Sequence, residues 1–498
     1  MREERMRREV EDVVPPGWLT IYFGENPGLK TVTDQPIEGF EKRRRRETRK
    51  AIEAENEQRK KHGKKPVTIV GIHAAPRGDS FSRQMVDRII GSAQDVGVEG
   101  NIIEIAMDAG KVNRDAVDCA REEICSADGF VITTHTKGGR FNSCCTAVFE
   151  ALEDADLHGK FIGFAHAYDS PAEDMHVGPL MIAQRFFEEK GCLILPYSFM
   201  YAHTGSNNEA WVERDIIGNG IRLARGIERL SKSHLVSVLE DPDALERHRA
   251  GGTLSPEWER LKKRAGEISA ERKENGQQPL NVLFVLGGES EKGKGARISK
   301  LLAKSFEFLG IETDTVHLAS HESAIESTAG NPNLTLGDVV RREGADNSDA
   351  FMQKAYRKLL QADMIIFSTP VRWFGVSWHL QKFMERMTPL ETSGFLLEGK
   401  AFGTIVTFGE AGGTEVRSHL GHFALHNGLM PIPFGGINEH LTFDLKQSKG
   451  LPFAKVHGMA ARGTALLVDF LAADGREVGK MDFKGIQHPL EEMIDPGD

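Results

Sequence analysis

The sequence predicts an α/β protein made of two tandem doubly wound domains, each with a five-stranded parallel sheet. The first observation is that short apolar runs of strand length alternate with amphipathic stretches of helical length along most of the 498 residues. Such alternation is typical of a parallel sheet with helices on both faces. The second observation is that the same order of elements occurs twice, which indicates an internal repeat.

The polar composition of the ends and of the middle of the chain separates the two copies. We expect a polar N-terminal arm over residues 1–65, a first domain over 66–232, a charged helical linker over 233–278, a second domain over 279–475, and a C-terminal tail over 476–498. The arm holds four consecutive arginines from Arg43 to Arg46. They belong either to a contact with phosphate or acidic lipid or to an exposed helix that packs on a partner subunit.

Within the copies, apolar runs predict the strands and amphipathic stretches predict the helices. In the first copy, strands are expected within 67–72, 127–136, 159–169 and 192–197, and helices within 84–98, through Phe187 and near 211–230. In the second copy, strands are expected within 280–288, 311–320, 362–370, 399–408 and 428–436. Its helices are expected within 300–310, 348–362, 380–387, through Leu425, and within 454–471.

Matching residues in the two copies define the offset between them. The pairs are Val67 with Val282 (offset 215), Asp128 with Asp363 (235), Lys160 with Lys400 (240), and Gly191 with Gly428 (237). The first two offsets differ by 20 residues. We therefore expect an insertion of that length in the second copy, between Leu318 and Phe351, which would serve as a lid or a dimer arm.

Composition limits the classes of function. A formal net charge of −10 argues against a general nucleic-acid binder. No apolar run reaches the roughly 18 residues that a membrane span needs. The N-terminal stretch MREERMRREVEDVV is charged throughout, so it does not predict a secretory signal.

The five cysteines indicate a reducing compartment. They are odd in number, lie in the first half of the chain, and form no C-x-x-C motif, so structural disulfides are not expected and we predict a cytoplasmic protein. The adjacent pair Cys144 and Cys145 is either redox-active or, as we favour, a pair of small residues facing the core.

The most informative stretch runs from Ala362 to Met387. An apolar strand ends at Pro370, which lacks a backbone donor, and Val371, Arg372, Trp373, Phe374 and Gly375 follow before an amphipathic helix. Loops at the carboxyl ends of parallel strands are where open α/β sheets bind ligands. Two aromatic residues before a glycine suit a planar ring system, whereas the alternative is that Trp373 and Phe374 only cover a hydrophobic core.

This stretch resembles the flavin-contacting segment of the NADPH-dependent FMN reductase and flavodoxin-like NAD(P)H:quinone reductase family. The family pattern is filled by Thr369, Pro370, Trp373, Phe374, Gly375, Ser377, Leu380, Phe383, Glu385 and Arg386, with the lysine displaced by one position to Lys382. The resemblance implies a flavodoxin-like strand order of 2-1-3-4-5, FMN at the carboxyl ends of the strands, and NAD(P)H as the co-substrate.

Two further loops of the second copy complete the predicted FMN site. The loop from Glu289 to Arg297 lacks the family's phosphate motif and the Walker A spacing, but its glycines and cations suit a phosphate; a solvated charged turn is the alternative. The loop after the strand FGTIVTF resembles the family's glycine-rich loop. The predicted cofactor-binding residues are Ser290, Lys292, Lys294, Gly295, Arg297, Pro370, Val371, Arg372, Trp373, Phe374, Gly375, Gly409, Glu410, Gly412 and Gly413.

The first copy keeps only part of this pattern. Ala75, Pro76, Arg77, Ser80 and Ser82 keep the outline of the family's phosphate loop, so Pro76, Arg77, Ser80 and Ser82 are weaker candidates for cofactor binding. The serines also suit helix N-caps. The segment from Thr136 to Arg140, with Lys137, Gly138 and Gly139, replaces the aromatic residues. This copy therefore binds a flavin differently, binds another anion, or serves as half of a pseudo-dimer.

We assign no catalytic side chain and no metal ligand, because in flavin enzymes the cofactor carries the electrons. His419, His422 and His426 share one predicted helix and favour a packing face over a metal site. Relatives with an iron–sulfur cluster have a compact run of cysteines, which is absent here, so we expect no cluster.

These features predict an FMN-dependent oxidoreductase that passes electrons from NAD(P)H to a quinone, a flavin or another small acceptor. The alternative is a non-catalytic flavin-binding scaffold or sensor built from a flavodoxin-like pseudo-dimer. The expected partner is a small-molecule electron acceptor, with neither nucleic acid nor membrane. The resemblance implies that the two copies form an intramolecular pseudo-dimer, and whether the chain also forms a homodimer is left open.

Overall fold

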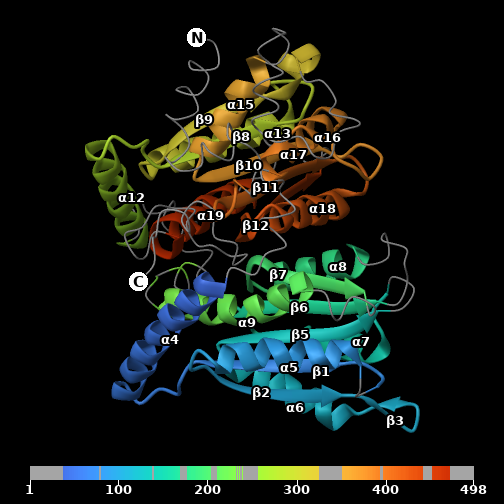
Figure 1. Ribbon diagram of the computed structural model, residues 1–498. Helices are drawn as coiled ribbons and strands as arrows, with labels where there is room; N and C mark the ends of the chain where they lie inside the picture. The colour runs from blue at the N-terminus through green and yellow to red at the C-terminus, as the bar shows by residue number, and fades with distance from the viewer. Residues whose placement is uncertain are drawn as a thin grey trace. The chain divides into compact units, whose positions relative to one another are not determined.

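The computed structural model describes residues 38–77, 80–136, 140–168, 177–203, 210–231, 256–324, 350–392, 396–440 and 451–471, together with residues 233, 235 and 238. These residues form two compact units (Figure 1). The first unit holds the described residues from 38 to 238, and the second holds those from 256 to 471. Each unit is described by itself.

The first unit is a five-stranded parallel sheet in the order β2-β1-β5-β6-β7. Its strands are β1 (Thr68–Ala74), β2 (Glu99–Ile105), β5 (Gly129–Thr136), β6 (Phe161–Tyr168) and β7 (Leu193–His203), and a short hairpin of β3 (Met107–Asp108) and β4 (Lys111–Val112) follows β2. Its helices are α4 (Glu38–Lys61), α5 (Phe81–Gln94), α6 (Arg114–Ser126), α7 (Ser143–Ala151), α8 (Val177–Glu189) and α9 (Ala210–Ser231).

The second unit has a sheet in the order β12-β11-β10-β8-β9, which is the same topology read from the other edge. Its strands are β8 (Asn281–Leu286), β9 (Glu312–His317), β10 (Met364–Pro370), β11 (Ala401–Phe408) and β12 (Met430–His440). Its helical elements are α12 (Pro256–Glu274), α13 (Lys294–Phe308), η3 (Leu318–Ala324), α15 (Ala350–Gln361), α16 (Trp378–Glu385), α17 (Thr388–Thr392), α18 (Gly413–His426), α19 (Leu451–Ala465) and η5 (Leu466–Leu471). The predicted fold class and the strand order 2-1-3-4-5 are confirmed for both units.

Helices cover both faces of each sheet, so the central strands are buried on both faces and apolar over most of their length. In the second unit, one face packs against α15, α16 and α18 around Leu283, Ile365 and Phe402. The opposite face lies against α13 and α19, where a Cβ at Gly403 would meet Met459. The small residues on the strands therefore set how closely the helices approach.

The hydrogen-bond register shows how far the two units agree. In both, the pairing of the last two strands shifts at the same place, between Ile162 and Phe164 in the first unit and between Phe402 and Thr404 in the second. Asp128 donates its backbone N–H to Thr68, and Asp363 donates its own to Asn281. The first strands therefore differ by 213 positions, from 68 to 281, so the predicted offset of 215 is wrong by two. Several alignments of two apolar runs match equally well, so the sequence does not determine which residues of β1 and β8 correspond. The backbone hydrogen bonds of the two strands do determine it.

The corrected offset makes the insertion 22 residues long, since the later offset of 235 holds between Asp128 and Asp363. The insertion falls in a segment whose residues 325–349 lie outside the described residues. The predicted C-terminal tail and the side chains of Arg43 and Arg44 also lie outside them.

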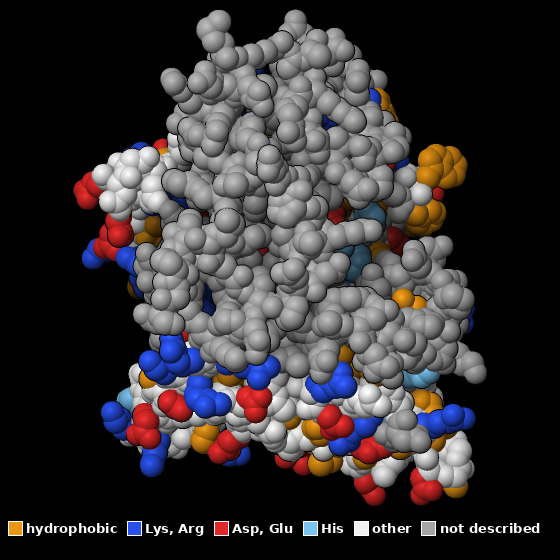
Figure 2. Space-filling model, viewed as in Figure 1, with side chains coloured by type: hydrophobic (Ala, Val, Ile, Leu, Met, Phe, Trp, Pro, Cys, Tyr) orange, Lys and Arg blue, Asp and Glu red, His pale blue; other side chains and the backbone are white. Residues whose placement is uncertain are grey.

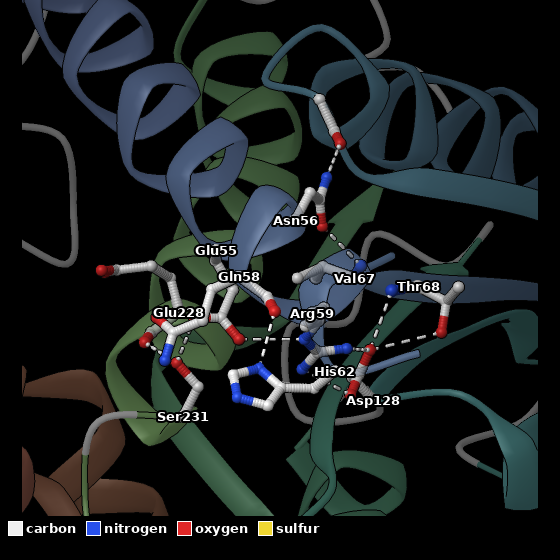
Figure 3. Close-up of polar contacts among 11 residues, drawn as sticks. Glu55, Asn56, Gln58, Arg59, His62, Val67, Thr68, Asp128, Glu228 and Ser231 are labelled. Carbon is white, nitrogen blue, oxygen red and sulfur yellow. Dashed lines mark hydrogen bonds and ion pairs between the residues drawn. The ribbon is translucent and has the colours of Figure 1, made fainter. Parts of the chain in front are cut away.

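A leading helix precedes the first strand in each unit. In the first unit, Arg59 of α4 donates two hydrogen bonds to Asp128 at 2.8 and 3.0 Å, and Asp128 also accepts the N–H of Thr68 at 2.9 Å (Figure 3). Glu55 binds both Arg59 and Ser231 of α9. These hydrogen bonds connect α4 to the starts of β1 and β5 and to α9 of its own unit.

The second unit repeats this arrangement. Arg272 of α12 donates to both carboxylate oxygens of Asp363 at 2.9 and 3.0 Å, and Asp363 accepts the N–H of Asn281 at 2.9 Å. Trp258 and Leu261 of the same helix are buried. The polar arm and the charged linker that the sequence predicts thus each contribute a helix to a unit.

Basic and acidic side chains are interspersed on the visible surface of α4, α5 and α6 (Figure 2). Among the described residues, no helix is long and apolar enough to cross a membrane.

Candidate functional site

The three loops predicted from the sequence meet at one edge of the second sheet. Strands β8, β10 and β11 are parallel neighbours, so their carboxyl ends lie together. Arg372 after β10 forms an ion pair with Glu289 after β8 at 3.3 Å. A Cβ placed on Gly412 after β11 would lie 2.9 Å from Val371 Cγ1. These contacts join the three loops into a single rim.

The loop after β10 is a tight two-residue turn. Arg372 and Gly375 exchange both backbone hydrogen bonds at 2.9 Å, and Trp373 and Phe374 occupy the two positions between them. Their φ angles are 50° and 62°. Positive φ at both central residues is the mark of a type I′ turn, which strongly prefers Asn and Gly. A side chain with Cβ in this region costs about 1–2 kcal/mol per residue.

Neither aromatic residue belongs to a core. Trp373 is 97% exposed and Phe374 is 62% exposed, while the neighbouring Trp378 is 48% exposed. The interpretation that the pair only covers a hydrophobic core is therefore wrong. Strained backbone that carries large exposed apolar side chains is typical of a ligand-binding rim.

The loop after β8 leads into α13 through an N-terminus without a side-chain cap. Gly293 occupies the N-cap position, and no side-chain oxygen accepts from the first turn. Lys292 and Arg297 are exposed and form no ion pair within the part of the chain that the structure describes. An open helix N-terminus flanked by cations attracts an anion. Lys294 differs from the prediction, because its ammonium donates to the carbonyl of His440.

Gly295 is required by close packing at the same place. A Cβ on this residue would lie 2.8 Å from Ser368 Oγ, so any larger residue would displace the first turn of α13. Gly412, which precedes α18, has φ 88° and would clash with Val371 and Phe374 if it carried a Cβ. Gly409 and Glu410 beside it are exposed, and Gly413 is buried. The backbone is therefore free of side chains at Gly295 and Gly412.

Buried hydroxyl groups lie at the strand ends, and Thr369 and Ser377 were named from the sequence but Ser368 and Thr407 were not. Thr369 Oγ1 accepts the N–H of Ser377 at 3.0 Å, and Ser377 Oγ accepts the N–H of Leu380 at 3.4 Å. Ser368 and Thr407 are also buried. The signal for Ser368 and Thr407 was present in the sequence, because both lie near the carboxyl ends of apolar strands. Together they fix the base of the Trp373 turn.

These features fit FMN. An uncapped helix N-terminus with free cations suits its phosphate, two exposed aromatic residues suit its ring system, and side-chain-free backbone suits a close approach. The assignment of individual residues to individual parts of the cofactor stays a prediction.

His419, His422 and His426 lie on α18, and the first and the last of them have different surroundings. Burial lowers the pKa of His419. His426, at the end of the same helix, instead pairs with Glu391 at 2.9 Å. Among the described residues, no group of three or more His, Cys, Asp or Glu side chains is placed to hold a metal ion.

The first unit presents a different set of groups at its strand ends. His73 Nε2 lies 3.0 Å from Ser80 Oγ and 3.1 Å from Ser82 Oγ. Ser80 is the N-cap residue of α5 but makes no side-chain cap hydrogen bond, so this expected capping role is wrong. Pro76 and Arg77 are exposed. Residues 137–139, which include Lys137, lie outside the described residues.

Cys144 and Cys145 are fully buried in α7, as the packing interpretation predicts. Burial raises the pKa of the Cys145 thiol to about 12, so it stays protonated near neutral pH. A protonated thiol is a poor nucleophile, so burial and the raised pKa favour the packing interpretation.

Comparisons with known proteins show what parts of the chain are similar to. Residues 280–439 match the family model described as NADPH-dependent FMN reductase, which confirms the resemblance for this part of the chain. An iron–sulfur flavoprotein of Archaeoglobus fulgidus is 24% identical over 156 residues, covering 31% of this chain and 67% of the relative. An iron–sulfur flavoprotein of Methanocaldococcus jannaschii is 25% identical over 151 residues, covering 30% of this chain and 74% of the relative.

One similar solved structure is described as a putative quinone reductase from Klebsiella pneumoniae. It is 16% identical to this chain, with a TM-score of 0.29, and the match covers 44% of this chain and 96% of that chain. Oxidised flavodoxin 2 from Bacillus cereus has TM-score 0.26 and 22% identity over 32% of this chain and 99% of that chain. These scores are too low to support an argument, and the topology of both units is instead established by their own strand register.

Proposed function

We propose that the second unit binds FMN and that the protein is an oxidoreductase passing electrons from NAD(P)H to a small acceptor such as a quinone or a flavin. The match of residues 280–439 to the FMN reductase family supports the class of activity. The observation that carries the proposal is the strained turn at Trp373 and Phe374, which exposes two aromatic rings beside an open helix N-terminus.

The copy in the first unit gives an internal comparison for this turn. The N-cap residues Asn142 and Ser377 are 235 positions apart, as are Asp128 and Asp363. The segments between them are therefore equally long, and Gly138 and Gly139 are the sequence counterparts of Trp373 and Phe374. Glycine adopts positive φ without strain. The second unit thus carries aromatic residues where a less costly choice exists within the same chain.

In this proposal the residues of the rim have separate roles. The N-terminus of α13, with Lys292 and Arg297, binds the phosphate. Trp373 and Phe374 flank the ring, and Gly412 lets the backbone approach it. Bound FMN would accept a hydride and return electrons to an acceptor, so the side chains need only bind, orient and limit water access.

Anaerobic reduction of the FMN-loaded protein tests the activity. We expect NADPH or NADH to remove the flavin absorbance, and a quinone or free flavin to restore it. The matched variant Gly412→Val, which would crowd Val371 and Phe374, should lose bound flavin and the reaction together. Bound flavin that neither nucleotide reduces would contradict the enzyme proposal and support the non-catalytic flavin-binding alternative.

A further inference from the structure

Trp378 is a large aromatic residue on the outward side of α16. Along an ideal helix, the buried residues Leu380, Phe383 and Met384 lie about 140–240° around the axis from Trp378. The tryptophan therefore lies opposite the side of α16 that packs on the core of the second unit, and it is 48% exposed. Outward positions of a surface helix normally carry polar residues, so an indole at this position needs a separate explanation.

The exposed indole extends the aromatic rim of the candidate site. Trp378 follows Gly375, which closes the aromatic turn, by three residues. A single exposed apolar residue is ordinary on a protein surface, whereas Trp373, Phe374 and Trp378 are three exposed aromatic residues within six positions. The offset of 235 places Ser143 at the matching position of the first unit. The third large ring therefore belongs only to the unit that carries the proposed FMN site.

The indole is held in place by its neighbour on α16. His379 is buried, and its imidazole stacks on the indole with the ring centroids 3.9 Å apart and 28° between the ring planes. Because a buried ring restricts the rotation of the side chain that stacks on it, little conformational entropy is left to lose when a ligand binds. Trp378 thus offers a pre-organised surface to a planar ring.

Lys382 adds a positive charge beside this surface. It lies one helical turn after Trp378, and its ammonium is 5.9 Å from the centre of the indole, at the outer limit of a cation–π contact. Among the described residues, this ammonium forms no ion pair, and the carboxylate of Glu385 on the same side of α16 accepts a hydrogen bond from Gln381 at 3.2 Å. The matching residue of the first unit is Ala147. An indole and an available cation therefore occur together only in the second unit.

One aromatic surface beside one available cation fits a planar ring that carries a single anionic group. A nicotinamide dinucleotide carries a pyrophosphate besides its rings, so its recognition calls for several cations or backbone donors. The other cation between β10 and α16, Arg372, is already paired with Glu289 at 3.3 Å. The observations therefore favour an electron acceptor over the nucleotide as the ligand of Trp378 and Lys382.

We propose that Trp378 and Lys382 determine the choice of electron acceptor and select a planar ring, such as a quinone, that carries an anionic group. The indole contacts the ring, and the ammonium pairs with the anion. This inference rests on the proposed function, which supplies the reduced flavin and the electron transfer. Trp378 and Lys382 bind and orient the acceptor, and they are separate from Lys292 and Arg297, which bind the phosphate of the cofactor in that function.

Anaerobic stopped-flow mixing tests the acceptor site in the full chain. FMN-loaded protein is reduced with one equivalent of dithionite and mixed either with a naphthoquinone sulfonate or with menadione, which lacks the charge. We expect the apparent dissociation constant of the sulfonate to rise at least about tenfold in Lys382→Gln while that of menadione is unchanged. Trp378→Ala should weaken the binding of both quinones, whereas Lys382→Arg and Trp378→Phe should retain most of the affinity. Lys304→Gln, at an exposed lysine of α13, is the matched control.

Two results would overturn the proposal. One is equal affinity for the sulfonate in the wild type and in Lys382→Gln. The other is a Lys382→Gln variant whose only defect is slower reduction of its flavin by NADPH, because Lys382 would then serve the nucleotide.

A redox-inert ligand separates this inference from the proposed function. Calorimetry measures the binding of naphthalene sulfonate without any turnover, and we expect the wild type to bind it at least about tenfold more tightly than Lys382→Gln does. The same difference in a protein that transfers no electrons would support the anionic ring site and contradict the proposed activity. Equal binding of naphthalene sulfonate by both proteins would contradict the site itself.

Discussion

Trp373 and Phe374 hold backbone angles that residues with a Cβ adopt only at a cost, and their side chains are 97% and 62% exposed. Among the described residues of the second unit, neither ring is buried in a core that would offset this cost. Apolar side chains normally gain about 25 cal/mol for each Å² that is removed from water. Such a gain becomes available here only when a ligand covers the rings, which is why we interpret the turn as a binding feature.

His73 carries a pH-dependent contribution to stability. Burial, followed by the nearby charge of Arg83, lowers its pKa from 6.5 to about 4. The unfolded chain therefore binds more protons than the folded chain between these values, so stability rises with pH there. It is lost as pH falls from about 6.5 toward 4.

We predict that the free energy of unfolding falls by about 2 kcal/mol more between pH 7.5 and 5 in the wild type than in His73→Gln. Glutamine removes the titrating group and can still donate to the serines. Urea unfolding at the two pH values measures the difference, and the exposed His62→Gln serves as control. An unchanged pH dependence in His73→Gln would show that the imidazole is not shielded as described.

At the scale of elements, the leading helices α4 and α12 determine where each unit begins. Both are rich in charge, and sequence patterns assign such segments to arms and linkers. The ion pairs of Arg59 with Asp128 and of Arg272 with Asp363 show instead that α4 and α12 pack onto the two units. A single arginine near the end of a polar helix gives no periodic signal in the sequence, so only the tertiary contact reveals its role.

We predict that Arg272→Met destabilises the protein by about 3 kcal/mol, since it leaves the buried carboxylate of Asp363 without its cation. Lys263→Met is the control, because Lys263 lies on the same helix with its side chain 80% exposed. The double variant Arg272→Met with Asp363→Asn should recover part of the loss. Denaturant unfolding measures the free energy of unfolding of all three variants. Equal losses of stability in Arg272→Met and Lys263→Met would contradict a stabilising role of the ion pair between Arg272 and Asp363.

At the scale of the whole molecule, the alternation of apolar runs predicted two parallel sheets, and the family resemblance supplied their strand order. Alternating apolar runs are a direct consequence of parallel strands buried on both faces, which is why the fold class was predicted correctly. The roles of the residues in the three loops of the candidate site stay predictions. The register between the copies and the strain at Trp373 could not be predicted. Many residue types can occupy a given position in a strand, so the sequence does not reveal the hydrogen-bond register. Trp and Phe rarely adopt positive φ, so this backbone conformation at Trp373 and Phe374 could not be expected from the sequence.

The two units use one topology for different surfaces at the same strand ends. The second unit combines an open helix N-terminus with exposed aromatic residues, whereas the first combines the same helix position with buried imidazole and hydroxyl groups. We therefore expect one flavin per chain rather than two.

The most direct test of the account is an FMN titration of the wild type and of the double variant Trp373→Gly with Phe374→Gly, which copies the glycine pair of the first unit. We predict one FMN per wild-type chain, affinity reduced roughly 100-fold in the variant, and an apoprotein whose melting temperature is no lower, since glycine relieves the strain. Phe308→Ala, an exposed aromatic residue at the end of α13, should bind FMN normally. Undiminished FMN binding by the double variant would contradict the central claim.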